Sequence, residues 1–413
     1  MSKINTYFSR KKIIELFYML TMSIAFTTRL GSTEINYIIS VVIAFLWMAI
    51  AMIIFFKNYL KNRINIIAFF KNNFDIPLLF LLPSILIYIY TIILLLFGKL
   101  GLNNLSTNIT AYTPALAVIS STYLFKNKTF NLTIKALIIS FLIVFAYNMY
   151  FYGFEILKQT FLNIIFGIDM TLTNAFEVHD LTFAAGIIVL LYILNKPLKE
   201  NNYILFVFLF IVFIGWKRIQ ILALLAIILL YFLSKKLVIT KKHIIVISIF
   251  TLTILLFYIY LIDSGTLTKL VNALNINSMG RIYYYDTIAK FFNFDIFEIG
   301  LGRNMVTQIL TSPQYSYLKV AGVHSDILKY FAETGFIVFS GWILYYFYVM
   351  PSYILKKYGH KIVKQFYLLT IYMFILYLTD NVDIYFCTQF TYILTIFFLT
   401  RSSKLKEVNL CEK

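Results

Sequence analysis

The sequence has few charged residues, only two cysteines, and no linker rich in Pro, Gly or Ser. Asp, Glu, Lys and Arg make up 13% of the 413 residues, while 61% are hydrophobic. A soluble domain usually carries about 25% charged residues, so this chain has too little polar surface to cover a soluble core. Its apolar residues form repeated runs of roughly 15–23, a length that spans a bilayer as a helix. The composition therefore excludes a soluble protein and a β-barrel, and it indicates an all-α polytopic membrane protein.

Several motifs that would define a metal or cofactor site are absent. Cys387 lies inside an apolar run and Cys411 lies in the tail, so we do not expect them to pair, and no metal-type Cys/His spacing occurs. No Asp-x-Asp motif lies on a segment predicted to face outward, so a metal-dependent nucleotide-sugar site is not supported. No P-loop occurs either. We therefore expect no metal and no cofactor, and any group transfer must use a donor that is already activated.

The hydropathy pattern predicts about twelve membrane spans. The first run, which begins near Ile13, lacks the small-residue cleavage site of a signal peptide. Several predicted spans hold only roughly 13–16 residues and cross only if the bilayer thins or flanking polar residues extend the helix. The spans lie at roughly 13–30, 35–56, 76–97, 109–125, 134–152, 180–194, 203–215, 219–233, 244–262, 334–350, 365–379 and 384–400.

Positive charges gather on alternate connections between these spans. With a cytoplasmic N-terminus, the inside segments hold 25 of the 36 Lys and Arg residues, and 13 of the 18 Asp and Glu residues fall outside. This positive-inside bias predicts that both termini are cytoplasmic. The net charge of +18 then follows from topology and anionic lipid, so we expect no nucleic-acid partner. The inside segments are 1–12, 57–73, 126–135, 195–202, 234–243, 355–364 and 401–413.

We expect residues 1–413 to form a single integral membrane domain, with 263–333 as a large outer loop between late spans. Apolar residues recur at helical spacing from Ile282 to Phe292, which predicts an amphipathic helix at the outer interface. Ser325 is a good N-cap residue and predicts the start of a second helix. Gly335 then marks a stop or a hinge before the next span.

Three arginines on the outer side are candidates for binding an anion. Arg218 interrupts a long apolar run, so we expect two short spans that meet at an outer turn, with Arg218 facing a cavity. Arg281 and Arg303 flank the predicted amphipathic helix, and their guanidinium forks suit phosphate oxygens. The turn Gly300-Leu301-Gly302 could direct backbone N–H groups at the same anion. The alternatives are solvated or snorkelling arginines and an ordinary glycine turn.

His324 is the candidate for proton transfer. It precedes a predicted helix N-terminus, where it could donate to a phosphate or take a proton from an attacking hydroxyl. The alternative is an ordinary surface histidine. Glu333 could cap a helix or pair with an arginine.

Two other polar pairs lie on the outer side. His179-Asp180, at the outer end of the sixth span, is a weaker candidate of the same kind. Asp380 and Asp383 form the last outer turn, and we expect them only to mark a tight turn between two spans.

Five short motifs follow one another in the C-terminal half. They are Gly215-Trp216-Lys217-Arg218 before a span, Gly280-Arg281 opening an amphipathic helix, Gly300-Leu301-Gly302, His324-Ser325-Asp326-Ile327-Leu328, and Glu333-Thr334-Gly335 leading into a span. This ordered set resembles the O-antigen polymerase and ligase superfamily, which includes the Wzy-type polysaccharide polymerases. The resemblance covers residues 215–350, and the preceding residues match only as a string of spans. The family's His is often followed by Asn, where this chain has Ser325, and Arg303 has no assigned place in the family pattern.

The resemblance implies a GT-C-like glycosyltransferase that acts at the outer face of the bacterial cytoplasmic membrane. Its donor would be a glycan linked to undecaprenyl diphosphate, and its acceptor would be the hydroxyl of another lipid-linked repeat unit. By position, Arg218, Arg281 and His324 match the family's functional arginines and histidine, with Glu333 and Asp326 as supporting residues. The implied partners are membrane lipids and the chain-length regulator and flippase of the same pathway.

We therefore expect a polymerase that extends capsule, exopolysaccharide or O-antigen chains. A diphosphate is a good leaving group, so guanidinium groups can stabilise its charge while His324 acts as base on the acceptor hydroxyl. His324 could instead donate to the diphosphate. A ligase of the same superfamily would use similar residues.

Two other classes of protein compete with this interpretation. A transporter of lipid-linked oligosaccharide would suit about twelve spans, although many transporters contain repeats that this sequence lacks. A structural partner of envelope enzymes would leave the outer arginines and histidine without a purpose.

Overall fold

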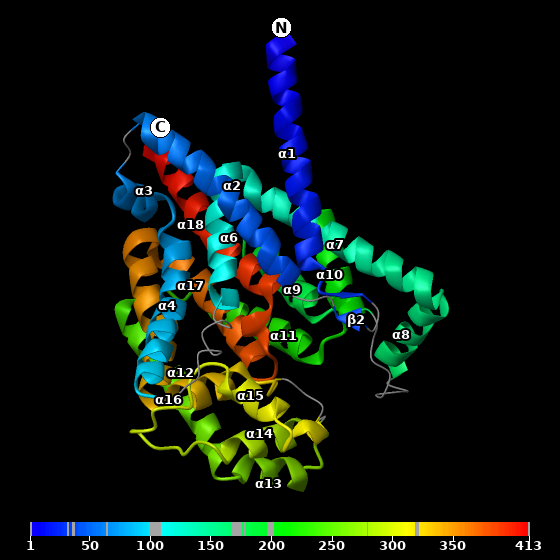
Figure 1. The fold of residues 1–413 in the computed structure, drawn as a ribbon, viewed down its shortest axis with the longest axis vertical. Coiled ribbons are helices and arrows are strands. Elements are labelled where there is room, and N and C mark those ends of the chain that lie inside the picture. Colours follow the sequence, from blue (N-terminus) through cyan, green and yellow to red (C-terminus); the bar gives the residue numbers. More distant parts are fainter. Residues whose placement is uncertain are drawn as a thin grey trace. The chain divides into compact units, whose positions relative to one another are not determined.

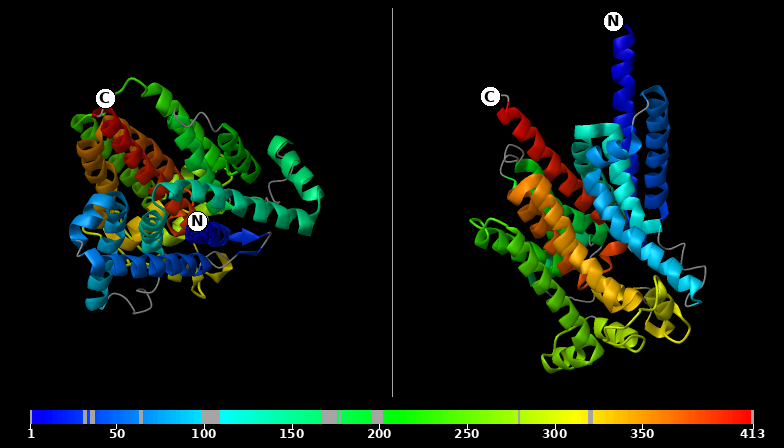
Figure 2. Two further views of the ribbon diagram at one scale, coloured as in Figure 1. Left: turned by 90° about the horizontal axis from the view of Figure 1, so that it is seen from above. Right: turned by 90° about the vertical axis from the view of Figure 1, so that its left-hand side faces the viewer.

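The computed structural model describes residues 2–30, 33–34, 38–62, 65–98, 109–166, 176, 178–195, 202–278, 280–318 and 322–411. Regular structure in these residues is almost entirely helical. The exception is a short antiparallel pair, in which β1 (Arg29–Leu30) joins β2 (Thr33–Glu34). The chain divides into two compact units, whose ribbons are drawn in Figures 1 and 2.

Unit 1 contains residues 1–78, 113–229 and 385–402. Its helices, some of which extend beyond it, are α1 (Ser2–Phe26), α2 (Ile38–Asn62), α3 (Ile66–Asn73), α6 (Ile109–Phe125), η1 (Lys126–Lys128), α7 (Thr129–Tyr152), α8 (Glu155–Phe166), α9 (His179–Leu194), α10 (Asn202–Gly215), α11 (Arg218–Leu233) and α18 (Phe386–Cys411). α1 packs against α2 and α7, and α9 packs against α10. Aromatic rings of Tyr18, Trp47 and Phe125 meet in its core, with Tyr18 5.0 Å from Trp47 and 4.5 Å from Phe125 between ring centroids.

Unit 2 contains residues 79–112, 230–384 and 403–413. Its elements, again including one that crosses the boundary, are α4 (Asp75–Leu96), α12 (Lys241–Asp263), α13 (Thr266–Ala273), α14 (Arg281–Ala289), α15 (Met305–Thr311), η3 (Ser316–Leu318), α16 (Asp326–Leu344), η4 (Tyr345–Val349), α17 (Met350–Tyr377) and η5 (Val382–Ile384). α12 packs against α16 and α17. The Ser248 hydroxyl of α12 donates to the Phe347 carbonyl over 2.8 Å, which satisfies a polar group that would be costly to leave unpaired in a buried site.

The sequence predicted where α16 begins and where it bends. The Ser325 hydroxyl accepts a hydrogen bond from the Leu328 N–H over 3.2 Å, which confirms the predicted N-cap. Gly335 interrupts the helix with φ 74° and ψ 177°, so the predicted hinge is also confirmed. Without a Cβ, glycine adopts this left-handed conformation at little steric cost.

Five helical segments of the described residues are long and apolar enough to cross a membrane. They are Ile38–Lys61, Asp75–Leu96, Ala111–Tyr152, Lys241–Asp263 and Asp326–Tyr377. Three shorter apolar helices, α9, α10 and α11, hold 10–17 residues each. An all-helical chain with these segments is compatible with a membrane protein.

The predicted number of twelve spans is only partly matched by these segments. Ala111–Tyr152 and Asp326–Tyr377 each cover two predicted spans, because short irregular turns inside them separate two apolar runs. The predicted spans at 13–30 and 384–400 fall largely on α1 and α18, which are not among the five segments found in the described residues. Twelve spans and the outer position of residues 263–333 remain predictions.

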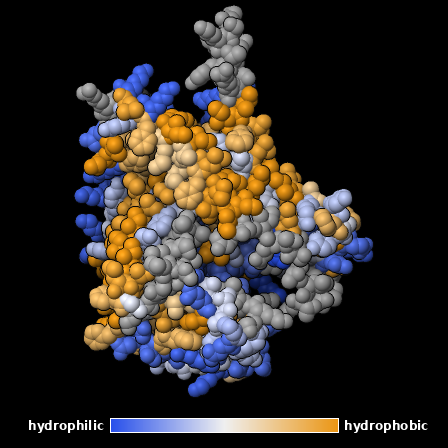
Figure 3. All heavy atoms as spheres, viewed as in Figure 1, coloured by the Kyte–Doolittle hydropathy of each residue, from blue (hydrophilic) through white to orange (hydrophobic). Residues whose placement is uncertain are grey.

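The surface changes in character between elements. In Figure 3 the surface over α2 is largely hydrophobic, and large apolar side chains such as Ile53 are 69% exposed there. Exposed apolar side chains of this extent suit contact with lipid. The surface over α13 and α14, at the bottom of the same view, is largely hydrophilic.

Candidate active site

His324 is held in a left-handed backbone conformation directly before α16. Its φ of 53° is uncommon for a residue with a side chain. The backbone is fixed from two directions, because its N–H donates to Oδ1 of Asn381 over 3.1 Å and its carbonyl accepts from the Tyr285 hydroxyl over 3.2 Å. Conformations of this kind persist where the surroundings over-determine them, and they cluster at functional sites.

The His324 ring lies beside a buried carboxylate. Its Nδ1 is 3.8 Å from Oδ1 of Asp380, whose side chain is fully buried, while 34% of the His324 side chain is exposed. A carboxylate in this position orients an imidazole through its charge. The exposed part of the ring can then exchange a proton with a molecule outside the protein.

Arg281 is the first residue of α14, as the sequence pattern predicted. Its side chain is half-buried, and the helix follows Gly280, which has φ 81°. Burial and the neighbouring Tyr258 raise the pKa of Tyr285 well above its usual value, and the positive charge of Arg281 opposes this shift. The guanidinium therefore acts on the same tyrosine hydroxyl that binds the His324 carbonyl. Tyr285 thus connects the surroundings of Arg281 with those of His324.

Arg303 lies in a buried network of charges. Its Nη2 is 2.9 Å from Oδ2 of Asp383, and its Nη1 is 3.5 Å from Oε2 of Glu333. The Lys329 ammonium lies 3.1 Å from the same Asp383 oxygen. The guanidinium also lies over the Tyr330 ring, 5.0 Å from its centroid. Only 7% of the Arg303 side chain is exposed, so its positive charge interacts mainly with these buried carboxylates.

The electrostatics of this network keep its two best-paired members charged. Burial by itself lowers the pKa of Arg303, but Tyr330, Asp383 and Glu333 outweigh burial, so this pKa is raised above its usual value. Burial raises the pKa of Asp383, but Lys329 and Arg303 outweigh burial, so this pKa is lowered below its usual range. The pairing thus compensates for removing both charges from water.

The Gly300-Leu301-Gly302 turn uses its backbone donors within the chain. Gly300 donates to the Glu298 carboxylate over 3.2 Å. Leu301 and Gly302 donate to the carbonyls of Ala332 and Glu333, each over 2.8 Å. These three N–H groups are therefore occupied. None of them is free to bind the diphosphate that the sequence analysis assigned to this turn.

The glycines of this turn instead permit close contact with α16. A Cβ on Gly300 would lie 2.4 Å from the backbone nitrogen of Gly335, and a Cβ on Gly335 would lie 2.1 Å from the Glu298 carbonyl oxygen. Both glycines also have positive φ, 81° and 74°. Two backbones can approach this closely only where side chains are missing.

The two aspartates in the last turn of unit 2 make more contacts with the candidate site than the sequence analysis predicted. Asp380 is buried and the Asp383 side chain is only 5% exposed, so the expectation that they only mark a turn is corrected. The Asp383 N–H donates to Oδ2 of Asp326 over 2.8 Å, and the Asp326 N–H donates to the Asp380 carbonyl over 3.3 Å. This short turn therefore brings one carboxylate to His324 and the other to Arg303.

Arg218 belongs to unit 1, whereas Arg281, Arg303 and His324 belong to unit 2. The predicted break before it is present, because α10 ends at Gly215 and Trp216 has φ 42°. The Arg218 side chain is exposed, and the neighbouring Lys217 is buried. Its part in a common site with His324 stays a prediction.

The weaker candidate pair, His179 and Asp180, also lies in unit 1. Both oxygens of the buried Asp180 carboxylate accept N–H groups at the start of α18, from Thr388 over 2.7 Å and from Cys387 over 3.0 Å. Nδ1 of His179 lies 3.3 Å from the Tyr385 hydroxyl. A carboxylate at a helix N-terminus satisfies free donors and interacts well with the helix dipole. Asp180 therefore fastens α18 to α9.

Among the described residues, no group of three or more His, Cys, Asp and Glu side chains could hold a metal ion. The sequence matches no protein-family model. It also matches none of the curated proteins to which it was compared. The resemblance to the O-antigen polymerase and ligase superfamily therefore rests on the residues themselves.

Proposed function

We propose that this protein is a polysaccharide polymerase of the bacterial cytoplasmic membrane, with both termini in the cytoplasm. Its donor is a glycan on undecaprenyl diphosphate, and its acceptor is the hydroxyl of another lipid-linked repeat unit. The observation that carries the proposal is the half-exposed His324 beside the buried Asp380 carboxylate, with their Nδ1 and Oδ1 atoms 3.8 Å apart. Such a group is unusual in a chain made mostly of apolar helices.

In the proposed reaction, the acceptor hydroxyl oxygen attacks the anomeric carbon of the donor glycan. The new glycosidic C–O bond forms as the bond from this carbon to the diphosphate breaks, and the electron pair leaves on the diphosphate oxygen. His324 takes the proton of the attacking hydroxyl. Asp380 serves as a positioning residue that orients the imidazole.

Arg281 has the chemistry that the leaving group requires. Its guanidinium is half-buried at the start of α14, and it can stabilise the charge that develops on the diphosphate. Arg218, which the sequence analysis names as another diphosphate ligand, belongs to unit 1, and its role stays a prediction.

Arg303, Gly300 and Gly302 are better suited to supporting the site than to binding the diphosphate. Arg303 is paired with two buried carboxylates, and the turn uses its N–H groups internally. Glu333 and Asp326 support the same region, because they contact Arg303 and the last turn.

Reconstitution tests this proposal. The purified protein in liposomes is given undecaprenyl-diphosphate-linked repeat units from the host, and the products are separated on a gel. We expect a ladder of lengths that Arg281→Ala abolishes and Lys290→Ala, which removes an exposed cation of the same region, preserves. Labelled lipid that crosses the bilayer without forming a ladder would identify a transporter instead. Transfer of finished glycan to a different acceptor would identify a ligase.

A further inference from the structure

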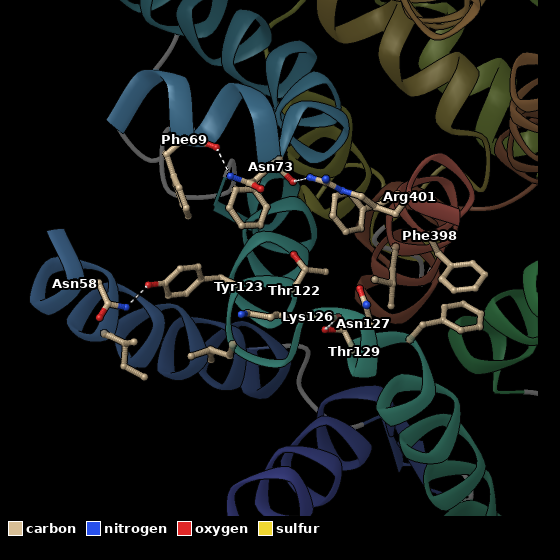
Figure 4. Close-up of a pocket in the computed structure, with 16 residues that line it drawn as sticks. Asn58, Phe69, Asn73, Thr122, Tyr123, Lys126, Asn127, Thr129, Phe398 and Arg401 are labelled. Atoms are coloured by element: carbon tan, nitrogen blue, oxygen red, sulfur yellow. Dashed lines mark hydrogen bonds between the residues drawn. The ribbon is translucent and has the colours of Figure 1, made fainter. Parts of the chain in front are cut away.

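Unit 1 contains a pocket that the proposed reaction does not use. Its volume is about 760 Å³, and α2, α3, the junction of α6 with α7, and α18 line it (Figure 4). The lining residues include members of the segments 57–73, 126–135 and 401–413, which the charge pattern assigns to the cytoplasmic side. The fold therefore gathers three predicted inside segments around one cavity.

The lining of this pocket is cationic. Lys126 and Arg401 contribute positive charges, and none of the 16 lining residues is Asp or Glu. Asn58, Asn73 and Asn127 add amide groups. Asn58 donates to the Tyr123 hydroxyl and Asn73 to the Phe69 carbonyl, and each amide nitrogen carries a second N–H. A pocket with two cations, several amides and no carboxylate has the chemistry of an anion site.

Lys126 is fixed in place by its backbone. It has φ 50°, and its carbonyl accepts a hydrogen bond of 2.9 Å from the Thr129 hydroxyl. The same hydroxyl is 3.0 Å from the Ser121 carbonyl, so the turn is tied to the end of α6. The exposed Lys126 ammonium has no ion-pair partner within the described part of the chain, and its charge is available to a ligand.

Within the described residues, the hydrogen bonds that orient Arg401 use one of its nitrogens. Nη2 donates to the carbonyls of Asn72 and Asn73. The guanidinium carbon also lies 5.2 Å from the centroid of the Phe397 ring. A guanidinium has five N–H groups, so the three on Nη1 and Nε can serve a bound anion.

The rest of the pocket is apolar, which a small soluble anion would not require. Phe69, Phe130 and Phe398 belong to its lining, and the last two rings stack 4.3 Å apart. On two of the helices that line the pocket, Leu60 of α2 is 78% exposed and Ile67 of α3 is 79% exposed. A cationic pocket lined by helices that also carry exposed apolar side chains matches a ligand with a charged head and hydrocarbon chains.

We propose that this pocket binds the phosphate headgroup of an anionic phospholipid at the cytoplasmic surface of the membrane. Lys126 and Arg401 contact the phosphate, Asn127 donates to its polar substituents, and an acyl chain follows the apolar surface of α2 and α3. Basic pockets between membrane helices on the cytoplasmic side suit this kind of ligand. The proposal is independent of the polymerase activity, because the pocket shares no residue with the candidate active site.

Native mass spectrometry of the full-length protein in detergent tests the assignment. The three probes are phosphatidylglycerol, phosphatidylcholine with the same acyl chains, and inorganic phosphate. We expect one phosphatidylglycerol to remain bound in preference to phosphatidylcholine. We also expect inorganic phosphate to compete only weakly, because it cannot use the apolar part of the pocket.

Charge substitutions locate the binding site. Each surface cation contributes roughly fivefold to the affinity for an anionic lipid, so Lys126→Gln should weaken phosphatidylglycerol binding about fivefold and Lys126→Gln/Arg401→Gln about 25-fold. Lys135→Gln is the matched control, because Lys135 is exposed on α7 outside the pocket, and it should change binding less than twofold. Equal losses in Lys126→Gln and Lys135→Gln, or equal retention of the two lipids, would overturn the proposal. Competition by inorganic phosphate at the same concentration as lipid would overturn the lipid assignment.

Discussion

Two charged clusters of unit 2 use their charge in opposite ways. Arg303 and Asp383 are 7% and 5% exposed, and they neutralise each other at 2.9 Å. His324 keeps 34% of its side chain exposed, and its nearest carboxylate, on Asp380, is 3.8 Å away. Both clusters depend on the same turn, because Asp380 and Asp383 lie three residues apart. The turn from Asp380 to Asp383 thus supplies one carboxylate to the buried ion pair with Arg303 and a second carboxylate to the partly exposed His324.

Under the proposed function, the Arg303 cluster supports the fold and His324 takes part in the reaction. A buried cation held between two carboxylates has little charge left for a substrate, and removing it leaves unpaired charge inside the protein. A half-exposed histidine can be removed with little effect on the fold, but it can exchange protons with a substrate. We therefore expect substitutions in the first cluster to change stability and substitutions in the second to change activity.

The largest effect on stability should come from Arg303→Ala. This change leaves Glu333 buried without its cation and leaves Asp383 with Lys329 alone, and breaking a buried ion pair typically costs about 3–5 kcal/mol of the free energy of unfolding. Arg281→Ala is the matched control, and for this half-buried arginine we expect less than about 1 kcal/mol. Thermal unfolding of the purified protein in detergent measures both. Equal unfolding temperatures for the two variants would show that the Arg303 network does not support the fold.

A smaller but distinct loss should follow Gly335→Ala. The new Cβ would lie 2.1 Å from the Glu298 carbonyl oxygen at φ 74°, and the strained backbone alone costs about 1–3 kcal/mol. Gly341→Ala in the same helix is the control, because apart from its chain neighbours and the adjacent backbone of its own helix no heavy atom lies within 4 Å of its Cβ position. We expect it to leave the unfolding temperature unchanged or slightly higher. If both variants unfold alike, the close contact between the turn and α16 is absent.

The smallest effect is a loss of stability in acid. The pKa of Asp383 is lowered in the folded protein, so its contribution is complete above its unfolded pKa of about 3.9. It decreases as the pH falls from there through the lower folded pKa. Asp383→Asn should lower stability at neutral pH and reduce the dependence on pH below about pH 4. If the stability of this variant depends on pH below about pH 4 as that of the wild type does, Asp383 does not contribute to the loss of stability in acid.

Local features of unit 2 could be predicted from the sequence because they depend on neighbouring residues. The N-cap at Ser325, the break at Gly335 and the start of α14 at Arg281 all follow from short-range patterns. The break before Arg218 followed from the cost of placing two cations in the middle of a long apolar helix.

The long-range pairings could not be predicted in this way. Arg303 and Asp383 are 80 residues apart, and no periodicity connects them. The contact between Gly300 and Gly335 likewise depends on how two separate segments fold together. In the sequence alone this contact is not visible, and the glycine turn resembles an anion site. A clue was present in the short connection Asp380–Asp383, because two acids there are notable in a chain with only 18.

The central claim is that His324 performs chemistry while the Arg303 network supports the fold. The most direct measurement is made on His324→Ala, with polymer formation in liposomes and thermal unfolding recorded from the same preparation. We predict that the polymerisation rate falls by about 10²–10⁴-fold, the usual contribution of a general acid or base, while the unfolding temperature stays near that of the wild type. His360→Ala, which removes an exposed histidine of α17, should leave both unchanged. A full-length polymer ladder from folded His324→Ala would contradict the claim.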